Sequence, residues 1–109
     1  MSAILVYVTC SSQDEARILA TLLLHEKLVA CANILPPHTA VYEWNGKTEM
    51  EEETAMLLKS TSDLYDKLEK TIRSKHSYDV PCIIQIPVEK GYKPFVDWIT
   101  SCCTRDKGL

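Results

Sequence analysis

The chain has 109 residues, which fits one domain, and its 46% hydrophobic and 25% charged residues exclude a disordered chain. A net charge of −3 with no run of Lys or Arg argues against nucleic acid as a partner, because non-specific nucleic-acid binding depends on neutralised phosphates. The longest apolar stretches, such as residues 20–24, are too short to cross a bilayer, so no membrane partner is expected.

The first strand and helix are predicted from the pattern that begins the chain. Residues 3–9 are rich in β-branched and aromatic side chains and indicate a buried strand. Residues 12–15 (SQDE) match a capping box, in which Ser12 caps the free amides of a helix and Glu15 reaches back. The helix is expected to end near Lys27. Its apolar face is formed by residues at helical spacing, which are Ala16, Leu19, Ala20, Leu23 and Leu24.

A long hairpin is predicted next. Residues 29–36 indicate a strand that the prolines at 36 and 37 interrupt, because proline supplies no amide donor, and residues 41–44 resume it. Asn45-Gly46 is a strong signal for a type I′ turn, which needs positive φ at both central positions. Residues 47–61 then return as one long strand.

The second half of the chain adds a helix, a strand and a short helix. Thr61 or Ser62 is expected to cap a helix with Leu64, Tyr65, Leu68 and Ile72 on one face. Residues 81–88 indicate a fourth strand, Pro94 suits the first turn of a last helix, and the polar tail from Thr104 is expected to fray. The order βαββαβ plus a helix predicts an α+β, ferredoxin-like single domain over residues 1–109. That fold hosts many functions and does not identify one.

The hairpin is too long for the helices that would cover it. Residues 29–44 span roughly 50 Å as a strand, whereas residues 13–27 span about 22 Å as a helix. The distal half carries Val41, Tyr42, Trp44 and Met50, which need burial. We therefore expect Tyr42, Trp44 and Met50 at an interface with a second chain; the alternative is a hairpin that curls back on its own sheet.

Cysteine usage suggests a reducing compartment. An odd number of cysteines, scattered through the expected strands, favours reduced thiols over a disulfide framework, and we expect a cytoplasmic location. The chain contains no CxxC pair, which argues against a structural zinc site. The five residues are Cys10, Cys31, Cys82, Cys102 and Cys103.

Several ordered segments resemble the motifs of one known family, CutA, from about residue 4 to residue 99. They are residues 6–10 (VYVTC), 28–36 (LVACANILP), 41–47 (VYEWNGK), 57–61 (LLKST), 76–81 (HSYDVP) and 87–88 (PV). The resemblance implies a cytoplasmic homotrimer with long hairpins paired between subunits, and a link to copper and other divalent cations. It also suggests a kinship in architecture with trimeric PII-type signalling proteins, which bind small anionic ligands between subunits.

One departure from the family motif bears on metal binding. The family usually has His-Pro-Tyr-Glu-x-Pro-Glu, and the last Glu of this motif is a candidate metal ligand. Here the corresponding segment runs from His76 to Cys82, so Cys82 stands in the place of that Glu. A thiolate favours soft ions, so Cys82 with His76 predicts a weak copper or zinc site, completed by water, Asp79 or a neighbouring subunit. The substitution could equally abolish a site, and His76 could simply tie down its loop.

A second hypothesis is a scaffold that binds a small anion or a partner protein in a cleft between subunits. Lys59 interrupts an apolar strand, so it points into a cleft or meets a carboxylate. With Tyr78 and Trp98, and with His76, it would line such a cleft. A third hypothesis is a mainly structural trimeric module that assembles another protein.

The remaining signals point to charge on the hairpin and away from catalysis. Glu49, Glu51 and Glu53 alternate and so share a face, where they are either a solvated strand edge, which we favour, or an attractor for hard cations. The sequence lacks a Ser-His-Asp order, a Gly-rich phosphate loop and an HExxH helix, so an enzyme is not expected.

Overall fold

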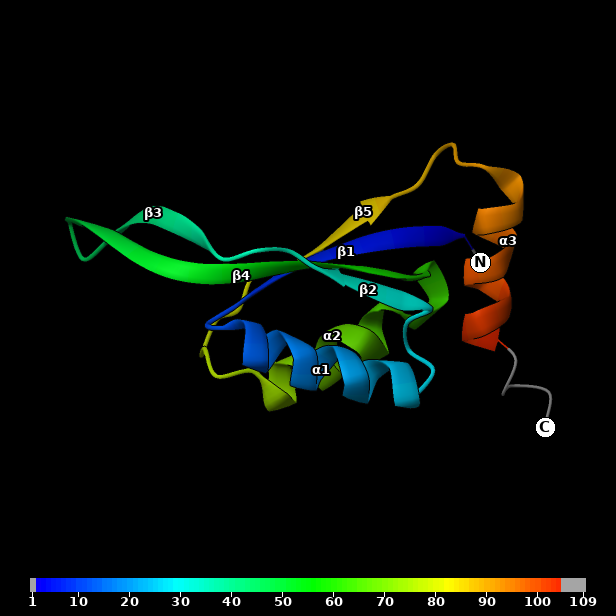
Figure 1. Ribbon diagram of the computed structural model, residues 1–109, viewed down its shortest axis with the longest axis horizontal. Helices are drawn as coiled ribbons and strands as arrows, with labels where there is room; N and C mark the ends of the chain where they lie inside the picture. The colour runs from blue at the N-terminus through cyan, green and yellow to red at the C-terminus, as the bar shows by residue number, and fades with distance from the viewer. Residues whose placement is uncertain (1, 105–109) are drawn as a thin grey trace.

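The computed structural model describes residues 2–104 and confirms the ferredoxin-like α+β arrangement (Figure 1). Helices α1 and α2 cover one face of an antiparallel sheet, and α3 lies at its end. The elements are β1 (Ala3–Cys10), α1 (Gln13–His25), β2 (Cys31–Ile34), β3 (His38–Trp44), β4 (Lys47–Thr61), a 3₁₀ turn (Ser62–Leu64), α2 (Tyr65–Lys75), β5 (Ile83–Pro87) and α3 (Lys93–Thr104). The tail was expected to fray from Thr104, but Thr104 still belongs to α3, and residues 105–109 lie outside the described part.

The sheet is organised around β4, which runs for 15 residues. Its strand order is β2-β4-β1-β5, and β3 pairs with the outer part of β4. The inner half of β4 pairs with β1, from Thr54 opposite Cys10 to Thr61 opposite Ala3. The outer half pairs with β3, from Glu53 opposite His38 to Lys47 opposite Trp44. One continuous strand therefore belongs both to the core sheet and to the projecting hairpin.

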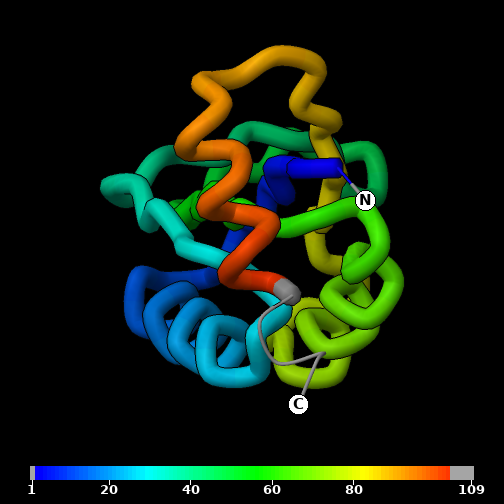
Figure 2. The backbone as a smooth tube through the Cα atoms, turned by 90° about the vertical axis from the view of Figure 1, so that its right-hand side faces the viewer, coloured from blue at the N-terminus to red at the C-terminus, as the bar shows by residue number. Residues whose placement is uncertain are grey.

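The core lies between the sheet and the first two helices. Alternate residues of the strands point to this side and are fully buried, and helical spacing brings apolar residues of α1 and α2 to meet them. The largest of these side chains are Ile4, Val6, Val8, Leu19, Leu23, Met56, Leu58, Leu68 and Ile72. Figure 2 shows α3 in front of the strands, with α1 and α2 side by side below. Within the described residues, no helix has the length and apolar character needed to span a membrane.

The helix starts differ from the sequence prediction in two ways. Ser12 caps α1 as expected, with its Oγ accepting the Glu15 amide at 3.1 Å, but the Glu15 carboxylate reaches the Ser11 amide. The second helix begins at Tyr65, after the 3₁₀ turn. Neither predicted residue caps it, because the Thr61 side chain makes no capping hydrogen bond and the Ser62 hydroxyl accepts the Ser2 amide.

The hairpin projects beyond the helices and gives the molecule its longest dimension, 49 Å. Its turn is as predicted, with φ of 53° at Asn45 and 76° at Gly46. The hairpin does not curl back on its own sheet, and in the single chain Trp44 is 65% exposed and Met50 70% exposed.

Candidate functional site

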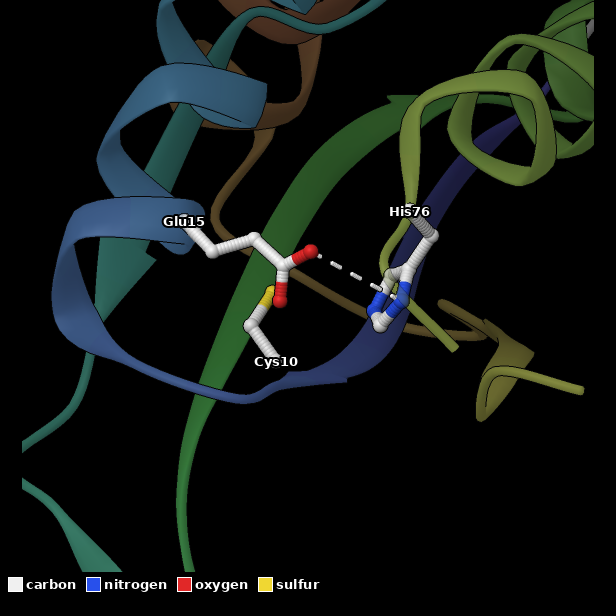
Figure 3. Close-up of side chains that lie close together, drawn as sticks. All are labelled: Cys10, Glu15 and His76. Carbon is white, nitrogen blue, oxygen red and sulfur yellow. Dashed lines mark ion pairs between the residues drawn. The ribbon is translucent and has the colours of Figure 1, made fainter. Parts of the chain in front are cut away.

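Three potential metal donors meet where β1 ends, α1 begins and α2 ends (Figure 3). Cys10 is the last residue of β1, Glu15 lies in the first turn of α1, and His76 follows α2. One donor atom from each lies within 4.8 Å of the others. Figure 3 shows the carboxylate of Glu15 pointing toward the imidazole ring, with the sulfur of Cys10 beside it. We call these three residues the buried cluster.

His76 uses both ring nitrogens for hydrogen bonds within the chain. Its Nε2 lies 2.8 Å from the carbonyl oxygen of Thr9, and its Nδ1 accepts the amide of Tyr78 at 3.0 Å. A carbonyl can only accept and an amide can only donate, so this pattern fits the neutral tautomer protonated at Nε2. The side chain is completely buried. The imidazole therefore fixes the loop after α2 against the end of β1.

Glu15 is held equally firmly. Its carboxylate accepts the amide and the hydroxyl of Ser11 at 2.8 and 2.9 Å, and the amide of Ser77 at 2.8 Å. Burial alone would raise the pKa of Glu15, but the hydrogen bonds from these two serines lower it to about 2. Glu15 is therefore an ionised group whose oxygens already have donors.

The buried cluster does not fit a resident metal ion. Burial, with the charges of Glu15 and Glu53, raises the pKa of Cys10 to about 12, so its thiol keeps the proton that a metal ligand must lose. His76 would have to give up a hydrogen bond before either nitrogen could bind a metal. We interpret the cluster as a structural latch.

A cleft of about 750 Å³ lies between one face of the hairpin and the loop that follows α2. The hairpin contributes Tyr42 and Trp44 from β3, with the three glutamates of β4, and the loop contributes Tyr78, Asp79 and Cys82. We call this the acidic cleft. The β4 residues are Glu49, Glu51 and Glu53.

Two tyrosines hold carboxylates of this cleft. The hydroxyl of Tyr78 donates to Glu53 at 3.0 Å, and the hydroxyl of Tyr42 donates to Glu51. The bond to Glu51, with some burial, raises the pKa of Tyr42 to about 12; burial and the bond to Glu53 raise the pKa of Tyr78. Both phenols therefore remain protonated donors at neutral pH. His38 lies at the inner end, with Nε2 3.8 Å from Glu53.

Cys82 lies in the acidic cleft and not in the buried cluster. Its side chain is half-buried, and burial together with the charge of Glu53 raises the pKa of its thiol, against a hydrogen bond from the Thr9 side chain. The donor group that contains His76 is completed by Cys10 and Glu15. The predicted pairing of Cys82 with His76 on one metal stays a prediction.

Of the residues expected to line an anion cleft, His76 and Tyr78 lie together, with ring centroids 4.9 Å apart. Lys59 donates to the amide oxygen of Asn33 on the neighbouring strand β2, so its partner is neutral and not a carboxylate. Trp98 lies on α3, where its ring packs against Phe95 at a centroid distance of 5.5 Å. Of the predicted set, only Tyr78 lines the acidic cleft.

The predicted interface residues divide between the two faces of the hairpin. Tyr42 and Trp44 line the acidic cleft, while Met50 pairs with Val41 on the opposite face. All four side chains are exposed in the single chain. The sequence alone was enough to predict this division, because alternate residues of a strand point to opposite sides of the sheet. The buried cluster had no comparable signal, since Glu15 was recognised only as a helix cap.

The CutA1 divalent ion tolerance protein family has a sequence profile that matches residues 4–102. The chain is 42% identical to the divalent-cation tolerance protein CutA of Archaeoglobus fulgidus, over 86% of this chain and 91% of that protein. It is 38% identical to the protein CutA of Mus musculus over 85% of this chain, and the match spans about half of the mouse protein, 52%.

The fold also closely resembles those of solved structures. The divalent ion tolerance protein CutA1 from Ehrlichia chaffeensis superposes with a TM-score of 0.90 at 34% identity, covering 94% of this chain and 95% of that one. The structure from Archaeoglobus fulgidus, described as a periplasmic divalent cation tolerance protein, gives a TM-score of 0.89 at 39% identity, covering 93% and 98%.

The predicted cytoplasmic location is corrected by these similarities. Besides the protein described as periplasmic, the relatives from Arabidopsis thaliana and Oryza sativa are named chloroplastic. The prediction rested on free cysteines, and the structure gives them another reason to be present. Cys10 and Cys103 are buried and pack as small apolar side chains in the core, which says nothing about a compartment.

Proposed function

Because the chain belongs to the CutA1 divalent ion tolerance protein family, we propose that it acts in divalent-cation tolerance as a homotrimer that binds copper or zinc. The observation that carries the metal part is the position of Cys82, whose thiol lies in a cleft with the carboxyl groups of Glu53 and Asp79. This is a binding function and includes no catalytic step.

The donor chemistry of the acidic cleft suits a soft or borderline ion. Cys82 would supply a thiolate and Asp79 or Glu53 a carboxylate oxygen, a combination that favours Zn(II) or Cu(I) over Mg(II). His76, the predicted second ligand, would join only by giving up its bond to Thr9 or Tyr78, at a cost of about 1 kcal/mol. Because the pKa of the Cys82 thiol is raised, binding would release a proton and strengthen as pH rises.

Support for the trimer comes from two strand edges and one apolar face. In the described part of the chain β3 pairs with β4 alone, and β5 pairs with β1 alone at the end of the sheet. A chain with two such different edges can associate head to tail, and such a contact closes into a ring when the rotation from one subunit to the next adds up to a full turn. The exposed Val41 and Met50 would be covered by the neighbouring subunit in that arrangement.

The alternative, a PII-like scaffold that binds a small anion, has less support. Tyr78 lies among four carboxyl groups, those of Glu49, Glu51, Glu53 and Asp79, which repel an anion. Lys59, the cation expected to attract one, lies on the β2–β4 pair with Asn33 as its partner.

A competition titration with Cu(I) and with Zn(II) tests the metal site. Wild type, Cys82→Ser and His76→Ala are compared with Cys31→Ser, which removes another half-buried thiol, at the start of β2 and outside the lining of the acidic cleft. We expect Cys82→Ser to lose at least tenfold in affinity and Cys31→Ser to match wild type. A loss in His76→Ala without unfolding supports the predicted pair. Equal binding by wild type, Cys82→Ser and His76→Ala would exclude the site.

A further inference from the structure

The two carboxyl groups that could complete the proposed metal site differ in how firmly they are held. Asp79 is exposed in the loop after α2, whereas only 16% of the Glu53 side chain is exposed. Oε2 of Glu53 accepts the hydroxyl of Tyr78 at 3.0 Å, and Oε1 lies 3.8 Å from Nε2 of His38. A side chain that is already ordered loses less conformational entropy on binding, so Glu53 can bind a metal at a lower entropic cost than Asp79.

Glu53 and Cys82 lie on either side of the end of β1. Glu53 is where the hairpin joins the core sheet, because the next residue, Thr54, already pairs with Cys10 at the end of β1. Cys82 directly precedes β5, which pairs with the other edge of β1. Both side chains line the acidic cleft, and burial followed by the charge of Glu53 raises the pKa of the Cys82 thiol. A cation bound between the two groups would relieve this unfavourable charge interaction.

Tyr78 connects the Glu53 carboxylate to the core of the protein. Its ring lies against the imidazole of His76, with centroids 4.9 Å apart, and its amide donates to Nδ1 of the same imidazole. His76 is in turn bonded to the carbonyl oxygen of Thr9 at the end of β1. The hydroxyl at the far end of the Tyr78 ring donates to Glu53. The position of the carboxylate is therefore set by a chain of contacts that begins in the core sheet.

A hydrogen bond to a metal-binding group fixes its orientation and strengthens metal binding. A carboxylate has more lone pairs than the one that Tyr78 uses, so Glu53 can accept the hydroxyl and bind a metal at the same time. We propose that Glu53 is the carboxylate ligand beside Cys82, and that Tyr78 is a positioning residue that holds this carboxylate in place. The assignment rests on the proposed metal function and favours Zn(II) over Cu(I), because a carboxylate oxygen suits the harder ion.

A Zn(II) competition titration of the full-length protein tests the assignment. Tyr78→Phe keeps the ring against His76 and removes only the hydroxyl, and it should lower Zn(II) affinity about tenfold or more, the usual cost of losing a hydrogen bond to a metal ligand. Glu53→Gln should lower the affinity further than Asp79→Asn does. Unchanged or higher affinity in Tyr78→Phe would overturn the proposal, and so would a larger loss in Asp79→Asn than in Glu53→Gln.

A double-mutant cycle separates the positioning of Glu53 from a general effect on the loop. If Tyr78 acts through Glu53, Tyr78→Phe should change Zn(II) affinity less than about twofold in the Glu53→Gln background. An equal loss in both backgrounds would contradict the proposal. Tyr65→Phe is the matched control, because its hydroxyl donates to Glu69 at 3.0 Å outside the lining of the cleft, and it should bind Zn(II) like wild type.

The outcomes also separate this assignment from the metal function on which it rests. Equal Zn(II) and Cu(I) binding by wild type and Cys82→Ser would exclude both. A loss in Cys82→Ser alone, or a wild type that binds Cu(I) but no Zn(II), would leave the metal function in place and overturn the role of Glu53. Light scattering checks that each variant has the oligomeric state of wild type. Should Glu53→Gln fail to assemble, the comparison of Tyr78→Phe with Tyr65→Phe still decides, because only the first should lose affinity.

Discussion

The carboxylate of Glu15 accepts the backbone amide of Ser77 at 2.8 Å, across 62 residues of sequence. This bond joins the start of α1 to the loop that carries Tyr78 and Cys82 into the acidic cleft. His76, one residue earlier, fastens the same loop to the end of β1. The buried cluster thus determines where one wall of the cleft lies.

The first prediction concerns the stability that Glu15 supplies. Glu15→Gln keeps the shape of the side chain but removes the charge that three hydrogen bonds stabilise, so the free energy of unfolding should fall by about 1–3 kcal/mol at neutral pH. Urea unfolding at one fixed protein concentration measures it. Glu26→Gln, at the exposed end of α1, should change the free energy by less than about 0.5 kcal/mol. Equal effects of the two substitutions would contradict the stabilising role assigned to Glu15 in the buried cluster.

The second prediction gives the pH range of this contribution. The pKa of Glu15 is about 2 in the folded chain against an ordinary 4.5, so the unfolded chain binds the proton more tightly. The contribution is therefore complete above about pH 4.5 and is lost as pH falls toward 2. We expect the difference in unfolding free energy between wild type and Glu15→Gln to shrink steadily over this interval. A difference that stays constant from pH 6 to pH 2.5 would assign the effect to packing.

The third prediction concerns assembly. Light scattering should show a trimer at micromolar concentration, and Met50→Lys should shift it to smaller species because it places a charge on the apolar face of the hairpin. Ile18→Lys is the matched control, since Ile18 is also 70% exposed but lies on α1. A stable wild-type monomer would refute the trimer. Dissociation by both substitutions would show that the hairpin is not the specific interface.

The fourth prediction compares two adjacent buried hydroxyls near the end of β4. Ser60 Oγ donates to the carbonyl of Leu28 at 2.6 Å, whereas Thr61 Oγ1 is buried with no hydrogen-bond partner among the described residues. Thr61→Val should therefore raise the free energy of unfolding by about 1 kcal/mol, and Ser60→Ala should lower it by about the same amount. Thermal melts at equal protein concentration check both signs. A Thr61→Val variant less stable than wild type would reveal a partner for its hydroxyl.

Sequence patterns predicted the elements that depend on neighbouring residues. The Asn45-Gly46 turn, the full extent of β4 and the Ser12 cap follow from turn chemistry, alternation and capping, and all are confirmed. The start of α2 was predicted wrongly because a 3₁₀ turn precedes the helix. The first side chain of that turn makes a tertiary hydrogen bond and does not cap the helix.

The site was harder to predict because it depends on distant residues. Cys82 and Tyr78 were selected from one short segment, and both line the cleft. The partners of His76 were not predicted, because Thr9 and Glu15 are more than 60 residues away in the sequence. They approach His76 only when β1, α1 and α2 pack together. Lys59 was expected to point into a cleft or to meet a carboxylate, yet its hydrogen-bond partner is a neutral amide on β2.

The continuity of β4 restricts how the length of the hairpin can change. Because β4 enters both ladders, one residue inserted near Glu53 would reverse the facing of every residue beyond it toward the tip, moving Glu49 and Glu51 from the cleft to the other side. Changes of two residues in β4, matched by two in β3, keep each face intact. Viable insertions and deletions in this arm should therefore come in even steps, shared equally between its two strands.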